Sequence, residues 1–173
     1  MKLLFFHLRN ISHIRKYLST VSTKTLIHAF ITCKLDNCNS VLYGIPQYYI
    51  QRLQLVENCA ARLVFNKRKF KHVPPHLINL HWLPIKQRIV FEILVITYKA
   101  LNAHVLGYIT GLLDRYVPAR QLRSSNTVSF KERTFSVAAP KLWYSVPFEI
   151  RSAGNLNQFK SKLKTYLFLH TYF

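Results

Sequence analysis

The sequence predicts a mainly α-helical protein, a bundle of about six to eight helices with a short irregular or β segment near residues 128–138. Two observations favour this fold class. Apolar residues recur at the spacing of one helix face in several segments. Glycine occurs only four times in 173 residues, whereas a turn-dense β architecture would need more of it. Half of the residues are hydrophobic, so the chain can build a core and wholesale disorder is not expected.

The first 65 residues predict three helices. A weak pattern covers residues 3–18, and Ser22 or Thr23 is expected to cap a second helix that stops before Gly44 and Pro46. The third helix, over residues 47–65, has the clearest amphipathic pattern. Its expected buried stripe is Tyr49, Leu53, Val56, Ala60 and Leu63. Its expected outward residues are Gln51, Gln54, Asn58 and Arg62.

Prolines mark several of the expected helix starts in the rest of the chain. Pro75 should open a short helix to residue 80, because proline at the first helical position loses no hydrogen bond, and Pro84 should begin a strong helix to about residue 102. A short helix over 105–113 precedes a weak, basic stretch in which residues 128–130 and 134–137 are candidate strands. Pro140 is expected to open the next helix, and Asn155 to cap the last, with Gln158 in the capping-box position.

These elements suggest a helical, thumb-like region over 1–113 and a second region over 114–173, in which a basic connector precedes the C-terminal helices. We expect both to pack as one domain, a size typical of this length. The residues expected to anchor its core are Leu53, Trp82, Ile89, Trp143 and Phe159. The apolar run at 3–6 is too short for a signal peptide, and residues 89–98 are too few to span a bilayer. With three cysteines, an odd number, a disulfide scaffold is not expected. The protein is therefore expected to be intracellular, nuclear or cytoplasmic, without a membrane partner.

Charge is the most unusual property of the sequence. It contains 25 Lys and Arg against six Asp and Glu, a formal net charge of +19, which indicates a polyanionic partner. The six acids lie far apart in the sequence, and no DxD, DD or ExxE pair is present. Chemistry that needs paired carboxylates, either to hold magnesium or to share a proton, is therefore not expected.

The densest basic cluster is the run 66–72, NKRKFKH. Its cations suit phosphate contacts and Phe70 could stack on a base, although a nuclear-import signal or a solvated loop would have the same composition. The candidate nucleic-acid-binding residues are Lys67, Arg68, Lys69, Phe70, Lys71, Arg120, Arg123, Lys131, Arg133, Lys160 and Lys164.

Other chemistries find little support. The histidines at 72, 76 and 81 and the cysteines at 33, 38 and 59 lack the spacings of a zinc site, so buried cysteines and a helix-cap histidine are favoured instead. There is no GxSxG elbow around a serine and no glycine-rich phosphate loop. We therefore expect no catalytic residues, no metal and no cofactor.

Several segments together resemble a known family. They are 35–46 (LDNCNSVLYGIP), 52–54 (RLQ), 58–64 (NCAARLV), 80–85 (LHWLPI), 87–89 (QRI), 98–101 (YKAL), 122–125 (LRSS) and 133–143 (RTFSVAAPKLW). Their order resembles the thumb and post-thumb region, C-terminal to the polymerase core, in reverse transcriptases of non-LTR retrotransposons of the chicken-repeat and jockey-like kind. The likeness extends over nearly the whole chain, although the stretch between Ser125 and Arg133 is shorter than in the family.

The resemblance implies an origin in an RNA-directed DNA polymerase, but not polymerase activity. The family's catalytic aspartates lie in a palm-domain motif, Tyr/Phe-Ala-Asp-Asp, which this sequence lacks. A thumb grips template and primer through their backbones, so the implied partners are RNA or RNA–DNA hybrid, largely independent of sequence, and the palm of the parent polyprotein. Two alternatives stay open, namely an inert translated remnant that exposes an apolar patch, and a module that binds another protein near Trp82 or Trp143.

Overall fold

A computed structural model describes residues 2–67, 72–102 and 135–173. In these ranges it contains seven α-helices of seven or more residues and no strand, which confirms the expected mainly α-helical bundle. The longer helices are α1 (Lys2–Ile14), α2 (Thr20–Ile27), α4 (Gln47–Val64), α5 (Pro74–Leu80), α6 (Ile85–Leu101), α8 (Phe135–Ser145) and α10 (Leu156–Tyr172). The shorter ones are η1 (Arg15–Tyr17), η2 (His28–Thr32), α3 (Cys33–Asp36), η3 (Asn39–Leu42) and α9 (Phe148–Arg151).

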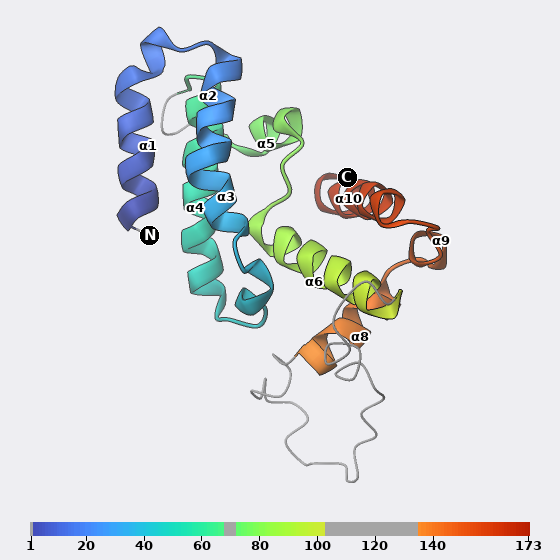
Figure 1. Ribbon diagram of the computed structural model, residues 1–173. Helices are drawn as coiled ribbons and strands as arrows, with labels where there is room; N and C mark the ends of the chain where they lie inside the picture. The colour runs from blue at the N-terminus through green and yellow to red at the C-terminus, as the bar shows by residue number, and fades with distance from the viewer. Residues whose placement is uncertain (1, 68–71, 103–134) are drawn as a thin grey trace.

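The helices form two groups joined by α6. In Figure 1, α1, α2 and α4 stand side by side, with α3 continuing the line of α2, while α8, α9 and α10 gather around the far part of α6. The N-terminal part of α6 contributes Ile85, Ile89 and Ile93 to a core shared with α1–α5, and its C-terminal part contributes Leu94 and Tyr98 to a second core. Because α6 is buried in both cores, it is the structural axis of the described chain.

The second core is built around aromatic rings. Phe159 of α10 is fully buried, and its ring stacks on that of Tyr98 with 4.3 Å between centroids and lies 5.8 Å from that of Trp143. The hydroxyl of Tyr98 donates a 2.7 Å hydrogen bond to the carbonyl of Ala153. Such a pair satisfies the one polar group that the buried tyrosine brings into the core.

The residues expected to anchor the core differ in their burial. Ile89 and Phe159 are buried, whereas Leu53, Trp82 and Trp143 are half-buried and pack on the margins of the two cores. The predicted boundary between regions at residues 113 and 114 lies outside the described residues, as do the short helix expected over 105–113 and the candidate strand over 128–130.

Three element predictions were wrong in detail. The second helix begins at Thr20, because Ser19 rather than Ser22 or Thr23 provides the N-cap, accepting a hydrogen bond from the Ser22 amide. It also continues through a π-helical segment, η2, before α3. Residues 135–137 are helical rather than extended, and Pro140 lies inside α8 instead of opening it. Buried Ala138 and Ala139 pack this helix against α6, so tertiary contact outweighs the local preference of proline for a first turn.

The buried stripe predicted for α4 was right only in part, since Val56 and Ala60 are buried and Leu53 and Leu63 are half-buried. Tyr49 is 54% exposed, whereas its neighbour Ile50 is buried, and the polar Glu57 is buried in line with Ile50. Because α1, α2, α5 and α6 all pack against α4, the helix buries more than one face. Gln54 and Asn58, expected to point outward, are half-buried and hydrogen-bonded to each other.

The caps of two long helices are well defined. Asn155 accepts a 2.8 Å hydrogen bond from the Gln158 amide at the start of α10, which confirms the predicted N-cap. At the C-terminal end of α4, the guanidinium of Arg15 donates to the carbonyls of Leu63 and Val64, at 2.9 and 2.8 Å. A cation at a helix C-terminus both satisfies carbonyls that lack partners and opposes the helix dipole.

Candidate nucleic-acid interface

Three of the predicted basic candidates lie in the described ranges. Lys67 is exposed directly after α4, Lys164 is exposed on α10, and Lys160 of α10 is half-buried. Figure 1 shows the end of α4 and α10 at well-separated places, so the structure does not gather these three lysines into one cluster. The other candidates, Arg68, Lys69, Phe70, Lys71, Arg120, Arg123, Lys131 and Arg133, lie outside the described residues.

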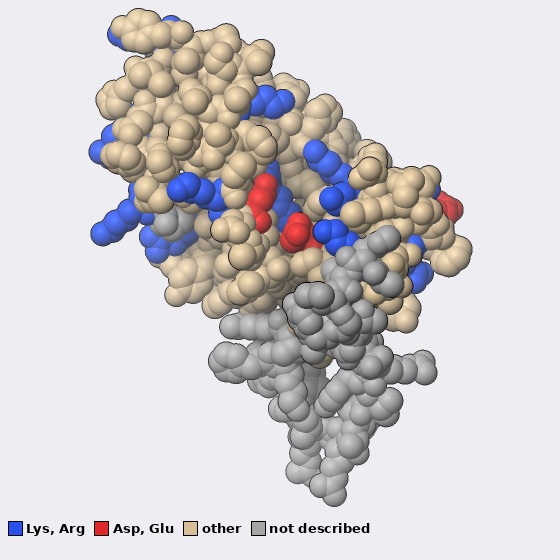
Figure 2. Space-filling view, in the orientation of Figure 1, with Lys and Arg blue, Asp and Glu red and all other residues tan. Residues whose placement is uncertain are grey.

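Positive charge on the face shown in Figure 2 is scattered rather than concentrated in one stripe. On that face, acidic side chains lie near the centre beside basic ones and also at the right edge. This distribution suits loose contact with a polyanion at several points.

Two exposed clusters combine arginine with aromatic rings, and sequence reasoning missed both. At the start of α4, the guanidinium of Arg52 lies 5.4 Å from the ring centroid of Tyr48 and donates to its hydroxyl at 3.2 Å, with Tyr49 alongside. Tyr48 and Tyr49 are 59% and 54% exposed. Exposed rings of this kind can stack on unpaired bases while the arginine meets phosphate.

The second cluster lies at the other end of the molecule. Arg151 of α9 lies 5.6 Å from the ring centroid of Tyr144 and 5.8 Å from that of Phe148, and both rings are largely exposed. The signal that could have revealed both clusters is an aromatic residue three or four positions before an arginine, which places them on one helix face.

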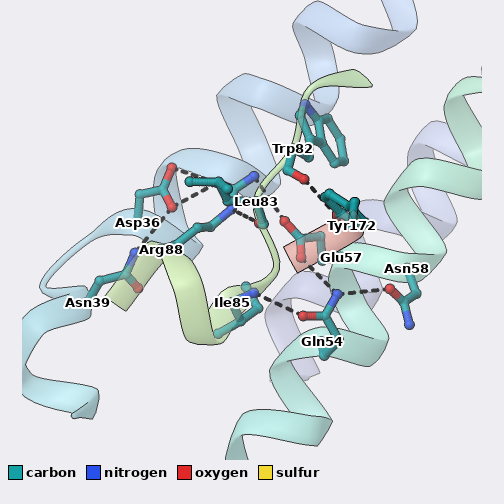
Figure 3. A network of polar contacts seen from close by, with 10 residues as sticks. All are labelled: Asp36, Asn39, Gln54, Glu57, Asn58, Trp82, Leu83, Ile85, Arg88 and Tyr172. Atoms are coloured by element: carbon teal, nitrogen blue, oxygen red, sulfur yellow. Dashed lines mark hydrogen bonds and ion pairs between the residues drawn. The ribbon is translucent and has the colours of Figure 1, made fainter. Parts of the chain in front are cut away.

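A buried ion pair network joins α3, α4 and α6 (Figure 3). Arg88 of α6 donates to both carboxylate oxygens of Asp36 at 2.9 and 3.0 Å, and to the Leu83 carbonyl at 2.8 Å. Its Nη2 lies 2.9 Å from Oε1 of Glu57, an ion pair without the alignment of a hydrogen bond. The two carboxylates, far apart in the sequence, thus meet at one guanidinium, which sequence spacing alone did not indicate.

Amide side chains extend this network along α4. Gln54 donates to Glu57 and to Asn58, both at 2.9 Å, and its carbonyl oxygen accepts from the Ile85 amide at 2.9 Å. The Ile85 amide is one of those at the start of α6 that have no partner within the helix. Gln54 therefore caps α6 from the neighbouring helix.

Burial changes the acidity of two groups in the network. Desolvation raises the pKa of Glu57 to about 7, although Arg88 and the hydrogen bond from Gln54 act in the opposite direction. Tyr172 of α10 donates to the Trp82 carbonyl at 2.9 Å, and burial together with the Glu57 charge raises its pKa to about 12. Tyr172 ties the last helix to the turn between α5 and α6.

The network includes residues from several of the motif segments identified in the sequence. Asp36 belongs to the LDNCNSVLYGIP segment, and Trp82, Leu83 and Ile85 belong to LHWLPI. Together with Gln54, Glu57 and Arg88, these residues join α3, α4 and α6 through the contacts just described. Residues of these motif segments therefore have a role in the packing of the fold.

Two cavities adjoin this framework. An apolar one of about 300 Å³ lies between η3, α4, α6 and α8, with Lys86 and Lys141 among its lining residues. A more polar one of about 380 Å³ lies between α3, the turn at residues 81–83, α6 and α10. Its lining residues include Asp36, Arg88, Glu92 and Lys164, so one predicted basic candidate borders a cavity with both charges.

The cysteine prediction needs correction. Cys33 and Cys38 are exposed and Cys59 is half-buried, so the expected buried cysteines are not found. His81 is the C-cap of α5, in a left-handed conformation with φ of 53°. Within residues 2–67, 72–102 and 135–173, no three His, Cys, Asp or Glu side chains converge as metal ligands would. In the same ranges, no helix combines the length and apolarity needed to cross a bilayer.

Comparison of the chain with protein-family models, curated proteins and solved structures found no match.

Proposed function

We propose that this chain is a non-catalytic nucleic-acid-binding segment derived from the reverse transcriptase of a non-LTR retrotransposon. It would grip the backbones of RNA or RNA–DNA hybrid, largely independently of sequence. The observation that carries this proposal is the charge balance of +19, with lysines and arginines exposed on most described helices. The motif series identified in the sequence supports the polymerase origin.

Some arginines have structural roles, whereas other cations are available to bind nucleic acid. Arg15 and Arg88 are engaged in capping α4 and in the ion pair network, so they are not free to meet phosphate. Lys67, Lys164, Arg52 and the aromatic rings of both arginine–aromatic clusters remain exposed, whereas Arg151 is half-buried. Binding would therefore combine phosphate contacts with stacking on exposed rings.

The test is filter binding to a primed RNA template across a salt series. Because neutralised phosphates release counterions, the logarithm of the binding constant should fall steeply against the logarithm of salt concentration. Changing Lys67, Arg68, Lys69 and Lys71 to glutamine should weaken binding and reduce the slope by up to about three.

A matched variant removes the same number of charges from α1, η1 and α2, through glutamine at Lys2, Arg9, Lys16 and Lys24. An equal loss in both variants would assign binding to net charge rather than to the 67–71 cluster. Affinity that does not change with salt would refute the proposal itself.

One observation favours the alternative of an inert translated remnant. Leu3, Phe5 and Phe6 on α1 and Phe30 of η2 are each more than 40% exposed, and His7 stacks on Phe30 with 5.3 Å between ring centroids. A stable, monomeric domain that protects the amides of α4, α6 and α10 from hydrogen exchange would argue against this alternative, whereas aggregation with unprotected amides would favour it.

A further inference from the structure

The cavity of about 380 Å³ differs in character from the rest of the surface. It is bordered by elements from both groups of the fold, since His28 and Asp36 come from the N-terminal group, Glu92 from α6 and Lys164 from α10. Two of the protein's six acidic residues, Asp36 and Glu92, line it. Carboxylates are scarce in this strongly positive chain, and two of them lie beside this one cavity.

These two carboxylates are not equivalent. Asp36 is occupied by both hydrogen bonds from Arg88 and by one from the Asn39 amide at 3.2 Å. Glu92 has neither an ion pair nor a hydrogen bond to any described residue. A carboxylate that faces a cavity repels phosphate but accepts hydrogen bonds strongly from N–H groups. Glu92 is therefore suited to a ligand that donates hydrogen bonds. The positive charge of the protein favours a ligand that also carries phosphate.

The other walls complete a consistent chemistry. Trp82 and Phe91 give the cavity aromatic surface, against which a planar ring can pack. Lys164 is exposed, borders both this cavity and a neighbouring groove, and has no ion pair to any described residue. A single nucleotide could place its donor-bearing base inside the cavity and its phosphate at the edge of the cavity. The cavity volume is of the right order for one nucleotide.

We propose that this cavity binds one unpaired guanine nucleotide, with Glu92 accepting from the base and Lys164 meeting its phosphate. Guanine is chosen because N1–H and the N2 amino group are adjacent donors that match the two oxygens of a carboxylate. Cytosine and adenine each offer one amino group beside an acceptor nitrogen, and uracil offers one N–H between two carbonyls. The inference rests on the proposed function, which supplies nucleic acid as the partner. It adds a preference for one base at the cavity that Lys164 borders.

The experiment compares guanosine and inosine monophosphates by calorimetric titration of the whole chain. Inosine differs from guanosine only in lacking the N2 amino group, so it removes one donor to Glu92. Guanosine monophosphate should bind about tenfold more tightly than inosine monophosphate, as expected for one hydrogen bond to a charged group. The variant Glu92→Leu, which has no acceptor, should bind the two equally, and Lys164→Gln should weaken both by the same factor.

Glu149→Leu is the matched control, because Glu149 is an exposed carboxylate on α9 that does not line the cavity. It should keep the tenfold preference. Equal binding of the two nucleotides by the unmodified chain, or no binding of either, would overturn the inference. If primed template still binds with a steep salt dependence in that case, the backbone grip stands and only the guanine site falls.

Discussion

Nη2 of Arg88 lies 2.9 Å from Oε1 of Glu57, a carboxylate whose side chain is 1% exposed. The same guanidinium reaches Asp36, whose side chain is 43% exposed, so one arginine links a buried acid to one at the surface. Burying an ion pair costs desolvation that its attraction only partly offsets, and removing one partner is far more harmful than removing both. The Arg88–Glu57 pair therefore leads to predictions of how substitutions and pH change the free energy of unfolding.

Replacing Arg88 by methionine should lower the free energy of unfolding by about 3–5 kcal/mol at pH 8, because it leaves Glu57 buried without a cation. Urea unfolding followed by circular dichroism measures this. Arg52→Met, which removes an exposed arginine of α4, should change the free energy by no more than about 0.5 kcal/mol. The double variant Arg88→Met with Glu57→Met should recover part of the loss. Equal effects of the two arginine substitutions would contradict this role of Arg88.

The raised pKa of Glu57 predicts a dependence of stability on pH. Between its ordinary value of 4.5 and about 7, the folded protein keeps a proton that the unfolded chain has released. The contribution of Glu57 to the free energy of unfolding is therefore fully present below pH 4.5 and is lost as pH rises through about 7. The loss is of the order of 3 kcal/mol.

Glu57→Gln isolates this contribution, because glutamine keeps the shape and does not titrate. The free energy of unfolding, measured in urea at several values between pH 4.5 and 8, should fall more with rising pH in the unmodified protein than in the variant. Parallel profiles would show that Glu57 titrates normally in the folded state.

The hydroxyl of Tyr172 is predicted to hold the end of α10 against the turn at Trp82. Tyr172→Phe removes the 2.9 Å hydrogen bond while keeping the ring, and should cost about 1 kcal/mol in the free energy of unfolding. Hydrogen exchange of amides in the last turns of α10 should become faster. Tyr166→Phe is the control, since no hydrogen bond joins the Tyr166 hydroxyl to a described residue. Similar exchange in both variants would count against the tie.

Aromatic residues of equal size should differ widely in their effect on stability. Phe159→Ala empties a fully buried site between Tyr98 and Trp143 and should cost about 3–5 kcal/mol. Phe148→Ala removes a ring that is 72% exposed and should change the free energy of unfolding by about 0.5 kcal/mol or less. Thermal unfolding of the two variants measures the contrast, and comparable losses would disprove the second core as described.

Local chemistry was enough to predict most helix ends. Prolines at 74 and 84 and the Asn155 cap lie at the starts of α5, α6 and α10, because proline restricts its own backbone and asparagine accepts a hydrogen bond from an amide three residues away. The same reasoning failed for α8 and for the buried face of α4. In both cases several helices pack on one element, and the burial that results depends on neighbours far away in the sequence.

The sequence by itself determined the fold class, the abundance of positive charge and most helix boundaries, since each follows from composition or from residues within a few positions of one another. Only the tertiary structure decided which charges are used. It joined Asp36 and Glu57 through Arg88, engaged Arg15 at the end of α4, and left Glu92 and Lys164 beside one cavity. Electrostatic energy and desolvation depend on distance and burial in space, and sequence separation specifies neither.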